Sequence, residues 1–285
     1  QGPRGFEFAG AGLRVSDAVR IDTHQAGDVN AGAVVTDAPI FGAGAGASLV
    51  IDTSSTSVTA NGGRIELVSI DDNGGSASFL EALTIDSRAT NGQALSTAGD
   101  VLVDGDVTIL GDWLLLDNAV VRTNADGVGD AGSATLSQTA VTDLGAGFAL
   151  TLDTSAPTDS SAGLIVLGNN AGGSVVDLAS FTIIADAGNG SPGTGTNGSV
   201  IFRSDDTSNA TVDVQTLDVS RVRGPMILEA ALTSFVLADS AADFSAVSGI
   251  VSSGDGVGGL SMDAGTVGVT LPSNVGQGPA AGLAR

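Results

Sequence analysis

The chain of 285 residues contains no cysteine, no tyrosine and no lysine, and it has one histidine and one tryptophan. The absence of cysteine excludes disulfide bonds and thiolate metal sites. The single histidine, His24, directly follows Asp22-Thr23, and no Gly-x-Ser-x-Gly sequence accompanies it. We therefore interpret His24 as an exposed turn residue and expect no catalytic residues in this chain.

Aromatic residues make up only 4% of the chain, whereas glycine occurs 42 times. A core built from this composition must consist mainly of Val, Leu, Ile and Ala, which favours strands joined by tight turns. The sequence lacks an 18-residue apolar run, so we expect no membrane span. It begins at Gln1 without a charged and apolar leader, from which we expect a mature or excised piece of an exported protein.

The net charge is −22, and aspartate accounts for most of it, with 28 Asp and 4 Glu against 10 Arg. Asp favours turns because its short side chain can bond the adjacent backbone. An acidic surface repels phosphate, which argues against nucleic acid and anionic lipid as partners. It remains compatible with divalent cations or a saline exterior.

A short phrase of apolar, any, apolar, Asp and a small residue recurs along the chain. Between Ile21 and Leu152 its central apolar residue is repeated at gaps of 30, 34, 31 and 36 residues. Alternating apolar residues followed by a turn-former predict a short strand that ends in a turn. The six occurrences are Val19–Thr23, Leu49–Thr53, Leu83–Ser87, Leu114–Asn118, Leu150–Thr154 and Leu260–Ala264.

A longer repeat of about 100 residues overlies this phrase and relates residues 47–146 to residues 148–248. Its best-matched blocks are Ala47–Ser54 and Phe148–Ser155, followed by Gly63–Leu67 and Gly163–Leu167. Strands that recur once per coil and stack on their equivalents form a β-solenoid. We therefore predict an all-β fold, a parallel β-helix with extended loops, as one domain over residues 1–285. Tandem β-sandwich domains of about 100 residues are the alternative.

Phrases such as Ala82–Asp86, Gly99–Val103 and Gly147–Asp153 resemble the repeats of filamentous haemagglutinins and autotransporter passengers. The resemblance extends over residues 13–271. It implies a right-handed parallel β-helix, secretion to the cell surface, and an adhesive or scaffold role. The coils here are longer than the usual repeat of that family, which predicts loops that leave the helix.

Parallel β-helices also include polysaccharide-degrading enzymes, for which paired carboxylates next to arginine are the candidates. The single Trp113 precedes Leu114–Leu116, so we interpret it as covering a strand face rather than as a sugar platform. The candidate carboxylates are Asp71-Asp72, Asp104 with Asp106, and Asp205-Asp206, and the candidate cations are Arg64, Arg88, Arg203, Arg221 and Arg223.

The glycine-rich loop at residues 124–130 is the candidate metal site. Asn124, Asp126 and Asp130 place three oxygen-bearing side chains within seven residues, a donor set that suits Ca²⁺. The spacing matches neither an EF-hand loop nor the calcium-binding nonapeptide repeat. A solvated turn is the alternative interpretation of this loop, and we expect no other cofactor.

These observations predict a non-enzymatic extracellular structural protein, a β-solenoid segment of a bacterial surface filament, matrix or adhesin. Its expected partners are other copies of itself or other surface proteins, with extracellular polysaccharide as an open alternative. Neither Gln1–Gly12 nor Gly276–Arg285 contains an obvious cap, and unpaired strands at solenoid ends invite association. The competing hypothesis is a β-helix that binds or degrades polysaccharide.

Overall fold

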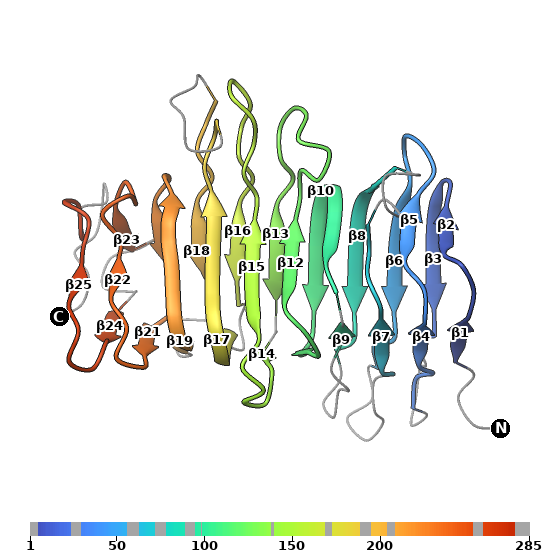
Figure 1. The fold of residues 1–285 in the computed structure, drawn as a ribbon, viewed down its shortest axis with the longest axis horizontal. Helices are drawn as coiled ribbons and strands as arrows, with labels where there is room; N and C mark the ends of the chain where they lie inside the picture. The colour runs from blue at the N-terminus through green and yellow to red at the C-terminus, as the bar shows by residue number, and fades with distance from the viewer. Residues whose placement is uncertain are drawn as a thin grey trace.

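The computed structural model forms a rod of stacked β-strands, with β1 and β25 at opposite ends of its long axis (Figure 1). The structure describes residues 5–23, 30–55, 63–71, 78–88, 95–97, 99–137, 140–168, 173–188, 195–203, 209–252 and 259–276. Within these ranges there is no helix, and hence none that could cross a membrane. The prediction of an all-β chain is confirmed.

The strands fall into three faces, and the chain visits the first, second and third face in turn in every coil. The first face contains β1 (Phe6–Phe8), β4 (Val34–Thr36), β7 (Ile65–Leu67), β9 (Leu95–Thr97), β11 (Trp113–Leu115), β14 (Ala140–Thr142), the N-terminal halves of β17 (Gly173–Ala185) and β19 (Asn209–Val222), β21 (Leu232–Leu237) and β24 (Gly259–Asp263).

The other two faces repeat this arrangement around the rod. The second face contains β2 (Leu13–Val15), β5 (Ile40–Gly42), the bridge residue Ile70, the start of β10 (Val101–Leu110), β12 (Ala119–Arg122), β15 (Ala149–Asp153), the C-terminal halves of β17 and β19, β22 (Ala242–Asp243) and β25 (Val269–Thr270). The third face contains β3 (Ala18–Asp22), β6 (Ser48–Asp52), β8 (Leu80–Asp86), the end of β10, β13 (Ala134–Ser137), β16 (Ile165–Leu167), β18 (Val200–Phe202), β20 (Met226–Leu228), β23 (Ile250–Ser252) and the bridge residue Val275.

All named strand pairs between successive coils are parallel, which is the arrangement of a parallel β-helix. The tandem sandwich alternative is therefore wrong, because antiparallel sheets packed face to face would pair neighbouring strands in opposite directions. The first face holds ten successive strands or half-strands in the described part of the chain. At about 4.8 Å per coil, nine intervals give a rod of about 43 Å.

Axial ladders of aliphatic side chains fill the interior. In β6 the side chains of Leu49 and Ile51 are buried while their neighbours face outward, as strand alternation requires. Ile21, Ile51, Ile85 and Ile109 are successive register partners on the third face. The recurring apolar residue of the sequence phrase is thus one step of an axial ladder in the first three coils. Because each fully buried Leu or Ile contributes about 1.5–3 kcal/mol, these ladders supply much of the stability.

One continuous hydrophobic core extends from the first coil to the last, from Val15 to Ala264. Its few aromatic side chains gather toward the C-terminal end, where Phe202, Phe235 and Phe244 form two edge-to-face contacts with ring centroids 5.3 and 5.6 Å apart. Trp113 lies fully inside the core on β11. A core with so few rings depends on the regular spacing of its coils rather than on individual bulky residues.

The recurring phrase does not stay on one face. Its first three occurrences end strands of the third face, the occurrence at Leu150–Asp153 lies on the second face, and that at Leu260–Asp263 lies on the first. The 100-residue repeat behaves in the same way, since β6 lies on the third face and its counterpart β15 on the second. The repeat therefore preserves a strand and its turn, while the position of that unit around the rod changes.

At the corner between the second and third faces, which we call the second corner, successive coils pass very close to one another. A β-carbon on Gly163 would lie 1.8 Å from the carbonyl oxygen of Gly132 in the preceding coil. The same position in the next coil is Gly198, where a β-carbon would lie 2.0 Å from the carbonyl oxygen of Gly163. Only glycine permits this approach, so the corner is built on an axial row of glycines.

Candidate functional site

The aspartates that end the strands close their own turns. Asp52 Oδ1 accepts hydrogen bonds from Ser54 N at 3.0 Å and from Ser54 Oγ at 2.6 Å. Asp153 makes the same pair of bonds with Ser155, at the same two distances. The two copies of the long repeat thus contain one turn in identical form, although they occupy different faces of the rod. A carboxylate that accepts a backbone amide hydrogen bond in this way stabilises the turn.

A second recurring device closes four of the loops that leave the solenoid. The hydroxyl of a threonine at the start of each of these loops donates to the carbonyl oxygen of a glycine at its end, and the glycine N–H donates back to the threonine carbonyl. The hydroxyl bonds are Thr23 to Gly32 at 2.6 Å, Thr53 to Gly63 at 2.7 Å, Thr123 to Gly132 at 2.6 Å and Thr154 to Gly163 at 3.0 Å. The β12–β13 and β15–β16 loops project on the same side of the rod (Figure 1).

Other aspartates connect one coil to the next. Asp104 Oδ1 accepts from Asp126 N at 2.7 Å, and Asp106 Oδ1 accepts from Ser133 N at 2.7 Å. In each case the carboxylate bonds a backbone amide of the following coil at a corner. Such caps satisfy amide donors where the chain turns between faces. Further examples are Asp100 to Val120 N, Asp112 to Ala140 N and Asp130 to Ser161 N.

Arginines pair with some of the strand-ending carboxylates. On the third face Asp22, Asp52 and Asp86 are in register, and Arg20 contacts the first two. Arg88 pairs with Asp86 at 2.7 Å. These hydrogen bonds to carboxylates raise the pKa of both guanidinium groups. Because the arginine side chains are about half exposed, such pairs contribute little stability individually and are screened by salt.

Two ion pairs at the second corner include more deeply buried carboxylates. Arg122 Nε lies 3.1 Å from Asp153 Oδ2, and Arg221 Nη2 lies 2.8 Å from Asp186 Oδ1. The side chain of Asp186 is fully buried, so the guanidinium neutralises a carboxylate that has left water. These arginines therefore balance charge in the corner, beside the glycine row.

The predicted calcium ligands lie on the loop between β12 and β13. Asn124 is buried and its amide donates to Gly129 O at 3.2 Å. Asp126 Oδ1 accepts from Val128 N at 2.8 Å, whereas Asp130 Oδ1 accepts from Ser161 N of the next coil at 2.7 Å. The described residues contain no cluster of three or more His, Cys, Asp or Glu arranged to hold a metal ion. The calcium site, which includes an asparagine, stays a prediction.

Asp104, which caps an amide at the second corner, has a raised pKa. Partial burial raises its pKa above the ordinary aspartate value, and the nearby charges of Asp126 and Glu81 act in the same direction. Hydrogen bonds from the backbone of Asp126 and Ala125 oppose the shift. The raised pKa of Asp104 thus results first from its partial burial at the corner and only secondarily from the two acidic side chains nearby.

The candidates for polysaccharide chemistry are dispersed by the fold. Arg64 pairs with Glu66, Arg88 with Asp86, and Arg203 with Glu229. Arg221 pairs with Asp186, while Arg223 is exposed. Asp71 accepts from Ser69 Oγ at 2.8 Å, and Asp104 and Asp106 serve as corner caps. Asp72, Asp205, Asp206 and His24 lie outside the described residues.

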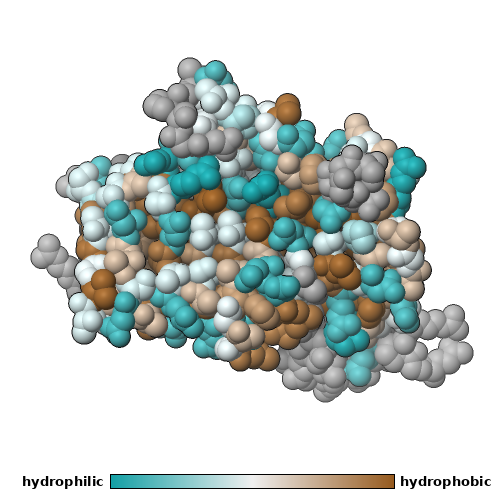
Figure 2. All heavy atoms as spheres, viewed as in Figure 1, coloured by the Kyte–Doolittle hydropathy of each residue, from teal (hydrophilic) through white to brown (hydrophobic). Residues whose placement is uncertain are grey.

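Trp113 cannot stack on a sugar in this structure because its side chain is fully buried. Its indole Nε1 donates to Thr97 Oγ1 at 2.9 Å, which satisfies the one polar atom of the ring inside the core. This agrees with its interpretation as a strand-covering residue. On the outer surface, hydrophilic and hydrophobic residues are interspersed over the face shown in Figure 2.

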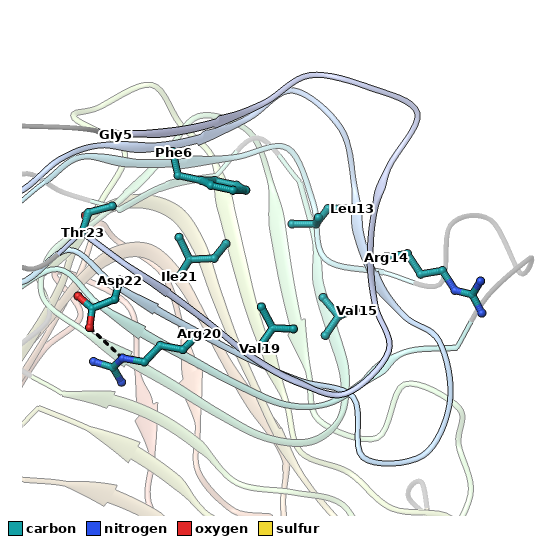
Figure 3. A pocket seen from close by; sticks show the side chains of 10 residues that line it. All are labelled: Gly5, Phe6, Leu13, Arg14, Val15, Val19, Arg20, Ile21, Asp22 and Thr23. Atoms are coloured by element: carbon teal, nitrogen blue, oxygen red, sulfur yellow. Dashed lines mark hydrogen bonds and ion pairs between the residues drawn. The ribbon is translucent and has the colours of Figure 1, made fainter.

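An apolar cavity lies at the N-terminal end of the rod, a feature for which the sequence predicted only an uncapped end. It has a volume of about 530 Å³ and is lined by residues of β1, β2 and β3. Figure 3 shows Phe6, Leu13, Val19 and Ile21 pointing into the interior of the first coil. Val19 and Ile21 belong to the first occurrence of the recurring phrase, and the alternation in Phe6–Phe8 and Leu13–Val15 is the signal that could have identified Phe6 and Leu13.

Comparison of the chain with protein-family models, with curated proteins and with solved structures found no match.

Proposed function

We propose that this chain is a non-enzymatic structural protein, a β-solenoid segment of a bacterial extracellular filament, matrix or adhesin. The observation that carries the proposal is the use made of its abundant acidic side chains. Asp52, Asp153 and Asp104 each cap backbone amides. Of the five candidate arginines, Arg64, Arg88, Arg203 and Arg221 are paired with carboxylates, and Arg223 is exposed. The polar groups of the described residues thus maintain the coil.

The proposed role is mechanical. Parallel ladders of backbone hydrogen bonds connect each coil only to its neighbours, and one core runs along the axis. Such a rod resists bending, while the loops closed by Thr123 and Thr154 stand out from one side as contact surfaces. These loops would contact other copies or other surface proteins.

The proposal is tested by pulling single molecules from both ends and by assaying catalysis in parallel. Neighbouring coils are about thirty residues apart, as from Ile21 to Ile51, so detachment of one coil should release about 100 Å of chain. We expect a series of force peaks with that spacing. A single cooperative rupture at low force would argue against a load-bearing rod.

Catalysis is assayed on a panel of acidic and neutral polysaccharides by measuring new reducing ends and unsaturated products. We expect no product above background. Turnover that the substitutions Asp104→Asn and Asp106→Asn abolish together would replace the structural proposal with the polysaccharide-degrading alternative. Immunogold labelling of the source cells tests the location, and labelling confined to the cytoplasm would contradict it.

A further inference from the structure

The two ends of the solenoid present strands that pair on one side only. In the described part of the chain β1, β2 and β3 pair with β4, β5 and β6, and with no other strand. At the other end β24 pairs with β21, and β25 pairs with β22. We call β1–β3 the N-terminal coil, and β24, β25 and Val275 the C-terminal coil. Unpaired parallel edges of this kind are templates for further strands.

The apolar side chains of both terminal coils are incompletely covered. Among the described residues, six hydrophobic side chains pack against the core without being fully buried, and five of them belong to the terminal coils. They are Phe6 and Leu13 at one end, and Leu260, Met262 and Val269 at the other. Val19, which lines the N-terminal cavity, is 40% exposed. Each inward residue has one axial neighbour where residues of inner coils have two.

We propose that copies of this chain stack end to end, with the C-terminal coil of one copy pairing in parallel with the N-terminal coil of the next. The inference rests on the proposed structural function and specifies its partner, a second copy of the same chain. Because the two contacting surfaces differ, the association is head to tail and has no intrinsic end, so it generates a filament.

The hydrogen-bonding groups at the junction are complementary. Phe6 N donates to Ala33 O at 2.8 Å and Phe8 O accepts from Asp37 N at 3.2 Å, so both residues bond toward the second coil. Strand alternation then directs the N–H and C=O of Glu7 to the open side. At the opposite end Gly259 N donates to Ala231 O at 2.9 Å, so the backbone of Leu260 faces the open side.

One register satisfies both the backbone and the side chains. Placing Glu7 opposite Ser261 sets Phe6 over Leu260 and Phe8 over Met262, so that inward apolar residues meet inward apolar residues. A shift of two residues toward the C-terminus of β24 would place Glu7 opposite Asp263, where two like charges destabilise the pair. The opposite shift would place Glu7 opposite Gly259 and move Met262 beyond the apolar residues of β1. On the second face the same rule places Leu13 over Val269 and Arg14 over Thr270.

A second copy of the chain fits the open N-terminal coil because that coil exposes strand edges on all three faces. A partner must offer strands on all three faces with inward apolar and outward polar residues. The other end of this chain does so with β24, β25 and Val275, which already continue the three faces from within. The junction would thus extend the ladders with the spacing they have inside the rod.

The charge of the chain sets the conditions for stacking. Each copy has a net charge of −22, so approaching rods repel one another at low ionic strength. Salt screens this repulsion over about 10 Å at 0.1 M, while apolar contact at the junction is retained. Assembly should therefore increase with both protein concentration and salt, the opposite of an assembly held by surface ion pairs.

The experiment is sedimentation velocity with negative-stain electron microscopy on the purified 285-residue chain, at increasing concentration and at 0.05–1 M NaCl (roughly spanning weak to strong screening). We expect linear filaments with the width of one solenoid, more abundant at high salt. A chain that stays monomeric up to its solubility limit at every salt concentration overturns the proposal. Side-by-side association without end contacts also overturns it.

Two substitutions are designed to disrupt the proposed junction, and a third serves as the matched control. Val19→Asp places a charge in the N-terminal cavity, and Glu7→Pro removes the open-edge donor without touching a bond to the second coil. Leu144→Asp adds the same charge to a side chain that is 76% exposed between β14 and β15, away from both ends and from the two proposed contact loops. We expect Val19→Asp to raise the concentration for half-assembly about a hundredfold, because an unpaired carboxylate would be desolvated at the contact.

For Glu7→Pro we expect a rise of about tenfold or more, and for Leu144→Asp no change. Circular dichroism and thermal unfolding of the monomers verify that each variant is folded. Equal assembly of Val19→Asp and wild type contradicts the proposed junction, as does equal loss in all three variants. Failure of stacking would leave the force and polysaccharide measurements unaffected, so the proposed structural function is judged separately.

Discussion

The row of glycines at the second corner provides the sharpest test of the fold. In the variant Gly163→Ala the new β-carbon would lie 1.8 Å from Gly132 O and 2.6 Å from the carbonyl carbon of the same residue. Both atoms belong to backbone, so the contact can be relieved only by separating two coils. That separation also strains the bonds that close the loop, Gly163 N to Thr154 O at 2.9 Å and Thr154 Oγ1 to Gly163 O at 3.0 Å.

The magnitude follows from these two effects. Overpacking in a rigid site costs about 1–3 kcal/mol, and each lost hydrogen bond adds about 1 kcal/mol, so we expect a loss of about 3–5 kcal/mol. The assay is urea unfolding followed by the fluorescence of Trp113, the single tryptophan, which is fully buried in a neighbouring coil. With an m value of about 3 kcal/mol/M, the midpoint should fall by about 1–1.7 M urea.

Gly268→Ala is the control for this measurement. No atom lies within 4 Å of a β-carbon at Gly268, so the same substitution meets open space. We expect the control to unfold within about 0.5 kcal/mol of the wild type. If Gly163→Ala also unfolds within that margin, the close approach of the coils is wrong. A control that loses as much stability as Gly163→Ala would show that the effect is not steric.

Three further predictions concern the aspartates. Asp153→Ala should lower the free energy of unfolding by about 2–3 kcal/mol, because both bonds to Ser155 and the ion pair with Arg122 are lost, and urea unfolding measures this. Burial raises the pKa of Asp104 in the folded state, so the stability that protonated Asp104 contributes is lost as the pH rises from the ordinary aspartate pKa through the raised one. Asp104→Asn should therefore flatten the dependence of the unfolding free energy on pH in this range. An unchanged dependence would contradict this explanation. If the loop at residues 124–130 binds calcium, Ca²⁺ should raise the thermal midpoint of the wild type but not of a chain carrying Asp126→Asn and Asp130→Asn, and calorimetry without heat of binding would exclude the site.

The sequence was sufficient to predict the fold class, because the pattern of inward residues is local. Ile21, Ile51 and Ile85 are adjacent in the structure, as the spacing of the phrase implied. The pattern could not tell which face a given strand occupies. A strand that ends in an Asp turn is compatible with any of the three faces, so Leu152 lies on the second face and Met262 on the first.

The positions of the loops explain why the repeated strand and turn lie on different faces in different coils. In the first two coils the loops closed by Thr23 and Thr53 leave at the corner between the third and first faces. In later coils the loops closed by Thr123 and Thr154 leave at the second corner. Threonine followed by glycine nine or ten residues later was a readable signal for this closure. The corner at which a loop leaves depends on the number of residues already used in that coil, which no local motif encodes.

The candidate site could be predicted only in part for a related reason. Asp126 and Asp130 are close in sequence and were grouped as ligands, yet Asp130 bonds an amide of the next coil, at Ser161. Pairing between coils depends on loop lengths that the sequence pattern does not reveal. The apolar cavity at the N-terminal coil was foreseeable as an open end, while its lining required the three faces to be assembled.

The excess of aspartate over glutamate has a structural cause in this arrangement. A carboxylate one methylene from the backbone reaches the amide two residues ahead, as Asp52 and Asp153 do, or an amide of the next coil, as Asp104 does. The longer and more mobile glutamate side chain loses more rotamer freedom when it is held in such a position. Because such caps recur along the rod and the chain has far fewer arginines than aspartates, negative charge accumulates as coils are added. The net charge of −22 is then a consequence of turn chemistry. The same charge makes salt the factor that should control whether the ends of two rods can meet.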